Sequence, residues 1–476
     1  MTTVSAERIT CDVCVVGGGP AGLSAALAAR RAGASVELLD LFERPGGQYF
    51  MQPAHPPTGA AARQVAEGRA LIEHVLASGV LIRSGVEVFG AYDEPLILAR
   101  RGDAALVVKP RAVVLATGAH DRPAPFPGWT LPGVMTPGAA QRLVKLHGTR
   151  PGSRVVLAGC GPFLLVVAAQ LRAAGCDVVR VVETSPSPLA LAAALARFPR
   201  HWPEAARIML AVVPLLPRFR FGRIVTRAAG ETHVTGAIIA RIGRDGRVLT
   251  EGAEELDGID ALLVGYGFRP SVELATMLGC ALAHDWDAGG AYVVADRVSG
   301  ATSVPGIFAA GEITGIAGAR PALAAGECAG IAAAGFAGKA TPSPDGGRLK
   351  QAMDFALALR RAFRPPYGTL GRLPQDDTLL CRCEEVRASE VRAALDEGAG
   401  DAHGVKMWTR AGMGPCQGRI CGFGISVYAG CAGSADPAVF GANAARLPAR
   451  PVPVDVLAAA VGMATREEGA QIIPTG

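Results

Sequence analysis

The stretch Asp12-Val13-Cys14-Val15-Val16-Gly17-Gly18-Gly19-Pro20-Ala21-Gly22 decides the fold of this 476-residue chain. Its first five residues are a mainly apolar, β-branched run typical of a buried parallel strand. An alanine- and leucine-rich helix is predicted to follow, and then a second strand that ends at Asp40. In this context Gly17 makes the tight turn, Gly19 lets the backbone approach a pyrophosphate, and Gly22 lets helix and strand pack closely. Asp40 is placed to bond ribose hydroxyls, so the segment predicts a dinucleotide-binding βαβ unit.

The composition excludes several classes of protein. Half of the residues are apolar (50%) and 19% are charged, so a large core is available and wholesale disorder is excluded. The net charge of +5 comes without any block of Lys and Arg, which gives no support for a nucleic-acid partner. The most apolar stretch, residues 155–171, is broken by Gly159-Cys160-Gly161-Pro162, so no transmembrane segment is expected.

The N-terminus and the cysteines predict a cytoplasmic protein. Residues 1–16 include Glu7 and Asp12 and have no basic leader before an apolar run, so a secretory signal is not expected. The eleven cysteines are an odd number, and several lie in apolar runs, which favours a reducing compartment. Clustered cysteines are then expected to bind metal or to carry out redox chemistry.

Three later motifs bear on which dinucleotide binds, because the first motif alone fits NAD or FAD. Residues 43–48 (Glu-Arg-Pro-Gly-Gly-Gln), 113–118 (Val-Val-Leu-Ala-Thr-Gly) and 302–312 (Thr-Ser-Val-Pro-Gly-Ile-Phe-Ala-Ala-Gly-Glu) resemble motifs of the pyridine nucleotide-disulfide oxidoreductase type of flavoprotein. The resemblance covers about residues 10–340 and implies FAD at the first site. It also implies that Glu312, where Asp is usual, holds the ribityl chain, and that the helix after Arg320 points its positive end at the flavin.

The FAD-binding residues implied by this resemblance come from all of these motifs. They are Gly17, Gly19, Pro20, Ala21, Gly22, Asp40, Arg44, Gly47, Gln48, Val88, Thr117, Gly118, Gly311, Glu312 and Ala322.

Residues 154–183 repeat the strand, glycine turn, helix and strand pattern. In the resembling family this copy binds NAD(P)H, and the corresponding residues here are Gly159, Gly161 and Glu183. Leu164 replaces the third glycine, so helix and strand are expected to pack less closely and the phosphate turn to be altered. Glu183 would repel a 2′-phosphate, which disfavours NADP. The second fold is therefore expected to be idle or to hold another adenine nucleotide, with an NADH site as the alternative.

No CxxC lies just after the Gly46-Gly47 motif or in the inserted nucleotide fold, the two places where disulfide reductases of this type carry one. The sequence has one CxxC, from Cys11 to Cys14 in the first strand, where a bridge is not expected. Dithiol exchange is therefore not predicted.

Four cysteines near the C-terminus form a C-x-C…C-x₄-C array. They are Cys381, Cys383, Cys416 and Cys421. Thiolates suit an iron–sulfur cluster or zinc, and unligated cysteines are the third possibility. The array resembles the bacterioferritin-associated-ferredoxin (BFD) type of [2Fe–2S] domain, which favours the cluster. Residues five apart on one helix point about 140° from each other, so Cys416 is expected to precede the helix that Cys421 enters. Arg382 and Arg419 are either counter-charges for the cluster or solvated surface residues.

The predicted fold class is α/β, with two nested Rossmann-like dinucleotide-binding domains of the three-layer ββα type and a small, mainly helical BFD-like [2Fe–2S] domain. The expected divisions are 1–148 and 266–340 (FAD-binding domain), 149–265 (inserted nucleotide domain), 341–375 (linker with helix), 376–440 ([2Fe–2S] domain) and 441–476 (C-terminal tail).

Over nearly the whole chain the sequence resembles the A subunits of opine oxidases, the corresponding subunit of hydrogen cyanide synthase, and the α subunits of hydroxyproline and proline dehydrogenases. Residues 116–135, Gly265-Tyr266-Gly267-Phe268 and the cysteine array carry this resemblance. It implies a FAD-containing, amine-oxidase-like β subunit that oxidises a C–N bond, and often a small ferredoxin-like subunit. The present chain would then transfer electrons through FAD and a [2Fe–2S] cluster.

Two other functions stay open from the sequence: a stand-alone NADH-dependent reductase, and a non-catalytic scaffold that binds nucleotides. No catalytic acid or base is predicted: His120, Asp121 and Arg122 could lie near the flavin as acid–base groups, but a polar loop between domains is the favoured interpretation.

Overall fold

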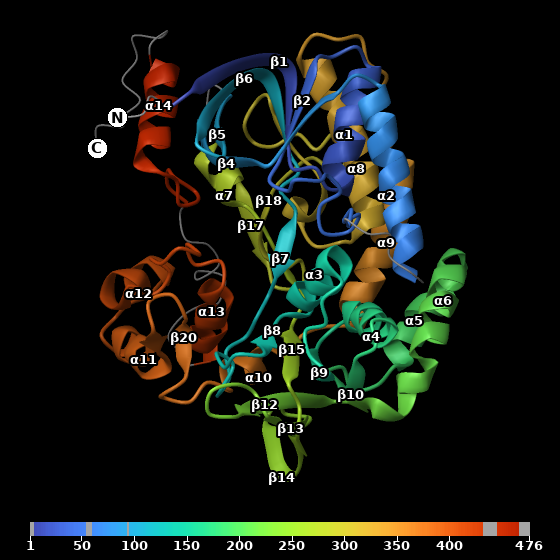
Figure 1. Ribbon diagram of the computed structural model, residues 1–476, viewed down its shortest axis with the longest axis vertical. Coiled ribbons are helices and arrows are strands. Elements are labelled where there is room, and N and C mark those ends of the chain that lie inside the picture. Colours follow the sequence, from blue (N-terminus) through green and yellow to red (C-terminus); the bar gives the residue numbers. More distant parts are fainter. Residues whose placement is uncertain (1–3, 54–59, 93–94, 432–444, 466–476) are drawn as a thin grey trace.

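The computed structural model describes residues 4–53, 60–92, 95–431 and 445–465. The chain forms two sheet-based domains and a helical C-terminal domain, which meet around two short crossing strands (Figure 1). No helix among the described residues is long and apolar enough to cross a membrane.

The first domain is built on a seven-stranded sheet in the order β3-β2-β1-β6-β5-β4, with β19 also paired to β6. The strands β3, β2, β1, β6 and β19 run parallel, and β4, β5 and β6 form an antiparallel meander. Its strands are β1 (Ala6–Val16), β2 (Val36–Asp40), β3 (Leu81–Ser84), β4 (Val86–Tyr92), β5 (Leu96–Arg101), β6 (Ala104–Leu115) and β19 (Ile307–Ala309).

One face of this sheet is covered by α1 (Pro20–Arg31), α2 (Ala60–Ala77) and α8 (Ala319–Phe336), as Figure 1 shows. Small residues bring α1 and α8 together, since a Cβ on Gly326 would lie 2.1 Å from the Ala21 carbonyl oxygen. The other face carries β17 (Leu282–Asp285), β18 (Gly290–Val293) and α7 (Glu273–Met277), and the turn η3 (Gly311–Thr314) follows β19.

The second domain has an all-parallel five-stranded sheet in the order β11-β10-β9-β15-β8. Its members are β8 (Val134–Met135), β9 (Arg154–Gly159), β10 (Asp177–Glu183), β11 (Phe219–Phe221) and β15 (Ala261–Gly265). The second domain is expected from the sequence to begin at residue 149, but β8, which precedes that residue, already belongs to its sheet. An antiparallel sheet of β12 (Arg223–Ala229), β13 (Gly236–Ile242) and β14 (Val248–Asp257) packs on one face.

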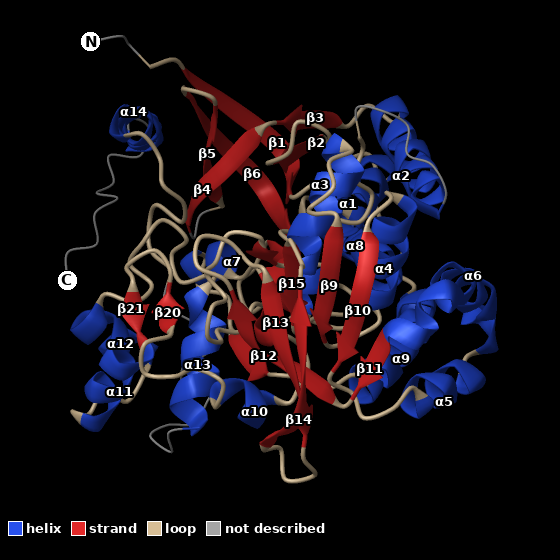
Figure 2. Cartoon of the chain, turned by 60° about the horizontal axis from the view of Figure 1, so that its bottom comes forward, coloured by secondary structure: helices blue, strands red, loops and turns tan. Residues whose placement is uncertain are grey.

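Helices cover the opposite face and one side of the second domain (Figure 2). They are α3 (Pro137–His147), α4 (Phe163–Ala173), α5 (Leu189–Arg197), η1 (Pro199–His201), α6 (Trp202–Val212) and η2 (Val213–Arg218). The two domains are joined by β7 (Ala119–Asp121) and β16 (Phe268–Pro270), which pair antiparallel with His120 opposite Arg269.

The C-terminal part begins with α9 (Gly346–Ala362), which lies between the first two domains, and α10 (Tyr367–Gly371). The small domain then contains β20 (Leu379–Cys381), β21 (Val386–Arg387), α11 (Ala388–Asp396), α12 (Ala402–Thr409) and α13 (Cys421–Cys431). Phe423 and Val427 of α13 pack in the core of the second domain.

The segment expected as a C-terminal tail contains a helix, α14 (Val454–Thr465). Its Val456, Ala460 and Ala464 pack against Phe89 and Leu98 on the antiparallel strands of the first domain. The chain therefore returns to the first domain after the cysteine-bearing one (Figure 1).

Candidate functional site

The first glycine turn has the close approaches that the sequence predicts. Gly17 has a φ of 109°, and a Cβ there would lie 2.3 Å from the Ala116 carbonyl oxygen. A Cβ on Gly22 would lie 1.7 Å from the Gly17 carbonyl oxygen. The Leu23 N–H donates to the Gly19 oxygen at 2.9 Å, so α1 is regular from its first turn and its N-terminus is free to face an anion.

Asp40 lies at the end of β2 with an unused acceptor. Its side chain is 4% exposed, and its Oδ2 is buried without a hydrogen-bond partner. Burial raises the pKa of this carboxyl to about 6. A buried carboxylate oxygen without a donor is costly by itself and fits a site completed by ribose hydroxyls.

The second FAD motif folds onto the first. The Gly46 N–H donates to the Gly18 oxygen at 2.8 Å, and a Cβ on Gly47 would lie 2.8 Å from the Gly19 Cα. Arg44 and Gln48 are exposed on the same loop, and Arg44 donates to the Pro53 oxygen at 2.7 Å.

The remaining predicted FAD residues come from three separate elements. Thr117 Oγ1 donates to the Ser271 oxygen at 2.7 Å, and the Ser271 N–H donates to the Gly118 oxygen at 3.0 Å. Ala322 lies in the first turn of α8, beside Gly311, whose own Cβ would meet Ala21 at 2.8 Å.

Two predicted residues are placed differently from the others. The Val88 side chain packs against the core, so only its backbone is available to a cofactor. Glu312 folds back on its own loop, because its Oε1 accepts from the N–H groups of Ala317 (2.9 Å) and Gly318 (2.7 Å). Burial raises the pKa of Glu312.

The second glycine turn differs from the first at the acid and at the helix start. Glu183 Oε2 accepts from the Gly161 N–H at 3.0 Å, and its Oε1 accepts from the Ser185 N–H at 2.9 Å. Leu164 is buried in the core beneath the sheet, and its N–H donates to the Gly161 oxygen at 3.2 Å in a tight first turn. The acid that should bond a ribose is therefore bonded to the glycine turn itself.

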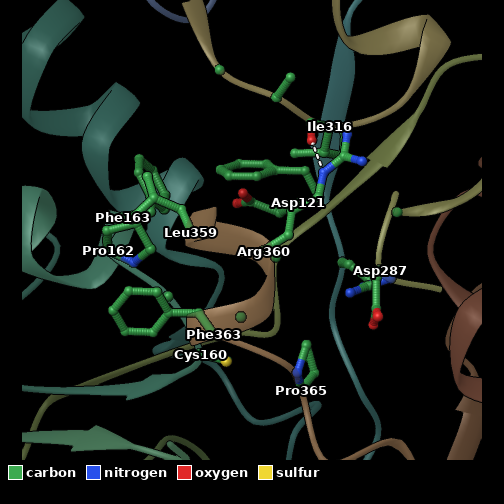
Figure 3. Close-up of a pocket in the computed structure, with 18 of the residues that line it drawn as sticks. Asp121, Cys160, Pro162, Phe163, Asp287, Ile316, Leu359, Arg360, Phe363 and Pro365 are labelled. Carbon is green, nitrogen blue, oxygen red and sulfur yellow. Dashed lines mark hydrogen bonds between the residues drawn. The ribbon is translucent and has the colours of Figure 1, made fainter. Parts of the chain in front are cut away.

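A cavity of about 240 Å³ joins the two nucleotide folds. The turn residues Gly161 and Phe163 line one side, and the 312–318 loop and α9 line the others, with Arg360 of α9 donating to the Ile316 oxygen (Figure 3). Its charged groups already bond protein atoms, as Asp121 accepts from the Gly138 N–H at 2.8 Å.

The four array cysteines lie together at the base of α13. The thiol of Cys421 interacts with those of Cys381 and Cys416, and Cys416 also interacts with Cys383. Contact with Cys421 lowers the pKa of Cys381 to about 6 and that of Cys416 to about 5, while the pKa of Cys421 is raised. Cys416 precedes α13 and Cys421 is its first residue, as predicted.

Backbone N–H groups also point at these thiols, from Glu384 and Gly412 to Cys381 and from Gly418 and Ile420 to Cys416. Glu385 and Gln417, beside the two cysteine pairs, have positive φ values of 54° and 53°. Strained turns that aim N–H groups at sulfur suit a thiolate-bound cluster. Within the described ranges no group of three or more His, Cys, Asp or Glu is arranged to hold a single metal ion.

The loop between Cys416 and Cys421 docks on the crossing strands. Arg269 Nη1 donates to the Gly418 oxygen at 3.1 Å, and Arg419 Nε lies 2.8 Å from Glu273 Oε1. His120, opposite Arg269, has a buried Nε2 without a partner, and burial together with Arg269 lowers its pKa to about 4. Arg269 is not among the residues predicted from the sequence, because no local pattern marks a residue that reaches a loop about 150 positions away.

Comparison with known proteins finds matches both for the two dinucleotide-binding folds and for the cysteine-bearing domain. Residues 11–327 match the model for "Pyridine nucleotide-disulphide oxidoreductase", and residues 379–428 match "BFD-like [2Fe-2S] binding domain". The A subunit of opine oxidase from Rhizobium meliloti is 33% identical over 96% of this chain and 89% of the relative. The chain belongs to this family of pyridine nucleotide-disulphide oxidoreductases. It is a FAD-dependent oxidoreductase with a [2Fe–2S] domain.

A second relative and a solved structure are also similar to this chain. Hydrogen cyanide synthase subunit HcnB of Pseudomonas aeruginosa is 32% identical over 86% of this chain and 90% of the relative. L-proline dehydrogenase from P. horikoshii has a similar fold, with a TM-score of 0.67 and 21% identity over 95% of this chain and 80% of that one.

Proposed function

We propose that this chain is the FAD and [2Fe–2S] electron-transfer subunit of a heteromeric amino-acid or opine dehydrogenase in the cytoplasm. A partner FAD-containing, amine-oxidase-like β subunit would oxidise the C–N bond, with a small ferredoxin-like subunit as a further partner. Similarity over nearly the full length to proteins named as subunits of opine oxidase and hydrogen cyanide synthase supports this assignment. All eleven cysteines are free, in keeping with a reducing compartment.

The observation that carries the proposal is the segment from Phe268 to Ser271. Ser271 bonds Thr117 and Gly118 of the proposed FAD site, and Arg269, two residues earlier, bonds Gly418 between two proposed cluster ligands. The two proposed cofactor sites therefore both contact this short segment of the chain. FAD can exchange two electrons, whereas a [2Fe–2S] cluster passes one electron at a time. A chain that holds both cofactors can therefore convert two-electron transfer into one-electron transfer.

The residues of the chain have separate tasks in this proposal. Gly17, Gly19 and Gly22 admit the pyrophosphate, Asp40 accepts from the ribose, and the N-terminus of α8 near Ala322 faces the flavin. Cys381, Cys383, Cys416 and Cys421 bind the cluster. Arg122, which donates to the carbonyl oxygens of Tyr266 and Trp286, fixes the crossing strands between the two sites.

The second fold is proposed not to take NADH as a reductant of the flavin. Glu183 uses the Gly161 N–H, which a pyrophosphate would need, and Leu164 fills the position of the third glycine. An idle site, or one that holds another adenine nucleotide at the cavity, fits this geometry better than a reductase does.

A pair of substitutions on α13 tests the cluster ligands. Cys421→Ser should remove nearly all iron and sulfide from the purified chain, because serine oxygen is a poor replacement for a buried thiolate ligand. Cys431→Ser, at the other end of the same helix, should retain them, since its thiol donates to the Gly368 oxygen, away from the four array cysteines. Equal iron and sulfide in the two variants would reject the ligand assignment.

An anaerobic spectrum tests the function within a heteromeric complex. The chain alone should show flavin and iron–sulfur absorbance that NADH does not bleach. Co-expression with the partner should allow the amino acid or opine to reduce both centres. Rapid bleaching by NADH alone would instead identify a reductase, and a flavin that stays oxidised during partner turnover would identify a scaffold.

A further inference from the structure

Arg269 is a partly buried cation beside the proposed cluster loop. It leaves the crossing strand β16 and donates from Nη1 to the Gly418 oxygen at 3.1 Å. A Cβ on Gly422 would lie 2.9 Å from the same nitrogen, so glycine at this first turn of α13 leaves room for the guanidinium. Arg269 also lines a small cavity together with Cys421. Its charge therefore acts directly on the loop that carries Cys416 and Cys421.

No carboxylate among the described residues lies within ion-pair distance of Arg269. The neighbouring Glu273 is paired to Arg419 at 2.8 Å, and Arg450, also close to this group, is paired to Glu87 at 3.8 Å. A partly buried cation that has no ion pair of its own still carries a desolvation cost, and the charge of Glu273 reaches Arg269 only in addition to that of Arg419. The missing negative charge fits the thiolates and the cluster that they would hold.

Arg382 and Arg419, the two arginines that the sequence suggested as counter-charges for the cluster, are less able than Arg269 to act on it. Arg419 is already neutralised by Glu273, and it holds the loop by donating to the oxygens of Cys416 and Ala449. Arg382 is exposed and lies over the Trp129 ring at 5.3 Å. Water and salt screen an exposed charge much more strongly than a buried one.

We propose that Arg269 is the residue that raises the reduction potential of the [2Fe–2S] cluster in this chain. The inference rests on the proposed function, because it requires the cluster at the four cysteines. Uptake of one electron makes the cluster more negative by one charge, so a fixed cation stabilises the reduced form more than the oxidised form. Arginine keeps its proton in proteins, so the effect persists across the working pH range.

The test is an anaerobic redox titration of the full chain, followed by electron paramagnetic resonance of the reduced cluster. Arg269→Gln should lower the potential by about 59 mV or more, which is a tenfold change in a one-electron equilibrium. Arg269→Lys should lower it less, because the charge stays. The exposed Arg382→Gln is the matched control and should change the potential least.

The outcomes separate this inference from the function on which it rests. Wild-type chain without iron, sulfide or a resonance signal would reject the proposed cluster. An intact cluster with an unchanged potential in Arg269→Gln would overturn the role of Arg269 alone. If Arg269→Gln does not retain the cluster, Gly422→Ala decides, because its Cβ would lie 2.9 Å from Arg269 Nη1 and push the guanidinium away from the loop, which should lower the potential. An unchanged potential there would overturn the proposal.

Discussion

The two glycine turns of this chain share the pattern Gly-x-Gly-Pro but have different surroundings. In the first, Gly22 lets α1 press on the Gly17 oxygen, and Asp40 keeps one buried oxygen without a partner. In the second, Leu164 is part of the core and Glu183 bonds the N–H of Gly161. A glycine-rich turn therefore indicates a nucleotide site only when its donors and its acid are left free for the ligand.

The largest expected difference between the two folds lies at the third glycine position. Gly22→Ala puts a Cβ 1.7 Å from a carbonyl oxygen, which should cost at least about 1–3 kcal/mol and reduce flavin content tenfold or more. Leu164→Ala should leave flavin content unchanged and lower the free energy of unfolding by about 2–5 kcal/mol. Flavin absorbance per chain and denaturant unfolding measure both. Loss of flavin in Leu164→Ala alone would reverse the assignment of the two folds.

The two acids should differ by a smaller factor. Asp40→Asn should raise the FAD dissociation constant about tenfold, or about 1.4 kcal/mol, because the amide replaces one acceptor oxygen by a donor. Glu183→Gln is the matched control and should leave FAD affinity as it is, since its oxygens bond Gly161 and Ser185. Fluorescence of released flavin at equilibrium measures the affinity. Equal affinities in the two variants would contradict the different tasks of the two acids.

The smallest effect is the pH dependence of flavin binding. Burial raises the pKa of Asp40 from 3.8 to about 6, so below that pH the carboxyl takes up a proton and accepts less well from ribose. FAD affinity should therefore fall as the pH drops through about 6. For the flavin-free chain the sign is opposite: the raised pKa makes this group's contribution to stability decline as the pH rises from 3.8 to about 6.

The control for the pH effect is Asp40→Asn, whose affinity should show no step near pH 6. Titration of flavin binding between mildly acidic and neutral pH compares the two proteins. A step of equal size in the variant would assign the pH dependence to another group.

Local patterns predict the parts of this molecule that depend on neighbouring residues. The strand, turn and helix around Gly17, and the position of Cys416 ahead of α13, follow from side-chain period and helix geometry. The bonds of Glu183 and Glu312 could not be predicted in this way, because an acid at the expected position says nothing about whether backbone N–H groups reach it first.

Long-range packing is also beyond the sequence patterns. No pattern in the sequence singles out Arg269, although its side chain reaches Gly418. Residues 454–465 are expected in a tail, but their apolar side chains form a helix that covers β5 and β6. Both depend on contacts between segments far apart in the chain, which single-sequence periodicity does not contain.

The return of α14 to the first domain has a consequence for how electrons would move. The cysteine-bearing domain is anchored on its entry side by α9, through Arg360 and Ile316, and on its exit side by α14 on the FAD-domain sheet. The domain also docks directly, because Phe423 and Val427 of α13 pack in the core of the second domain, so it is held in place rather than swinging as a tethered carrier. Transfer between the two centres should then be a first-order step without a conformational gate, with a rate set by separation and driving force and insensitive to solvent viscosity.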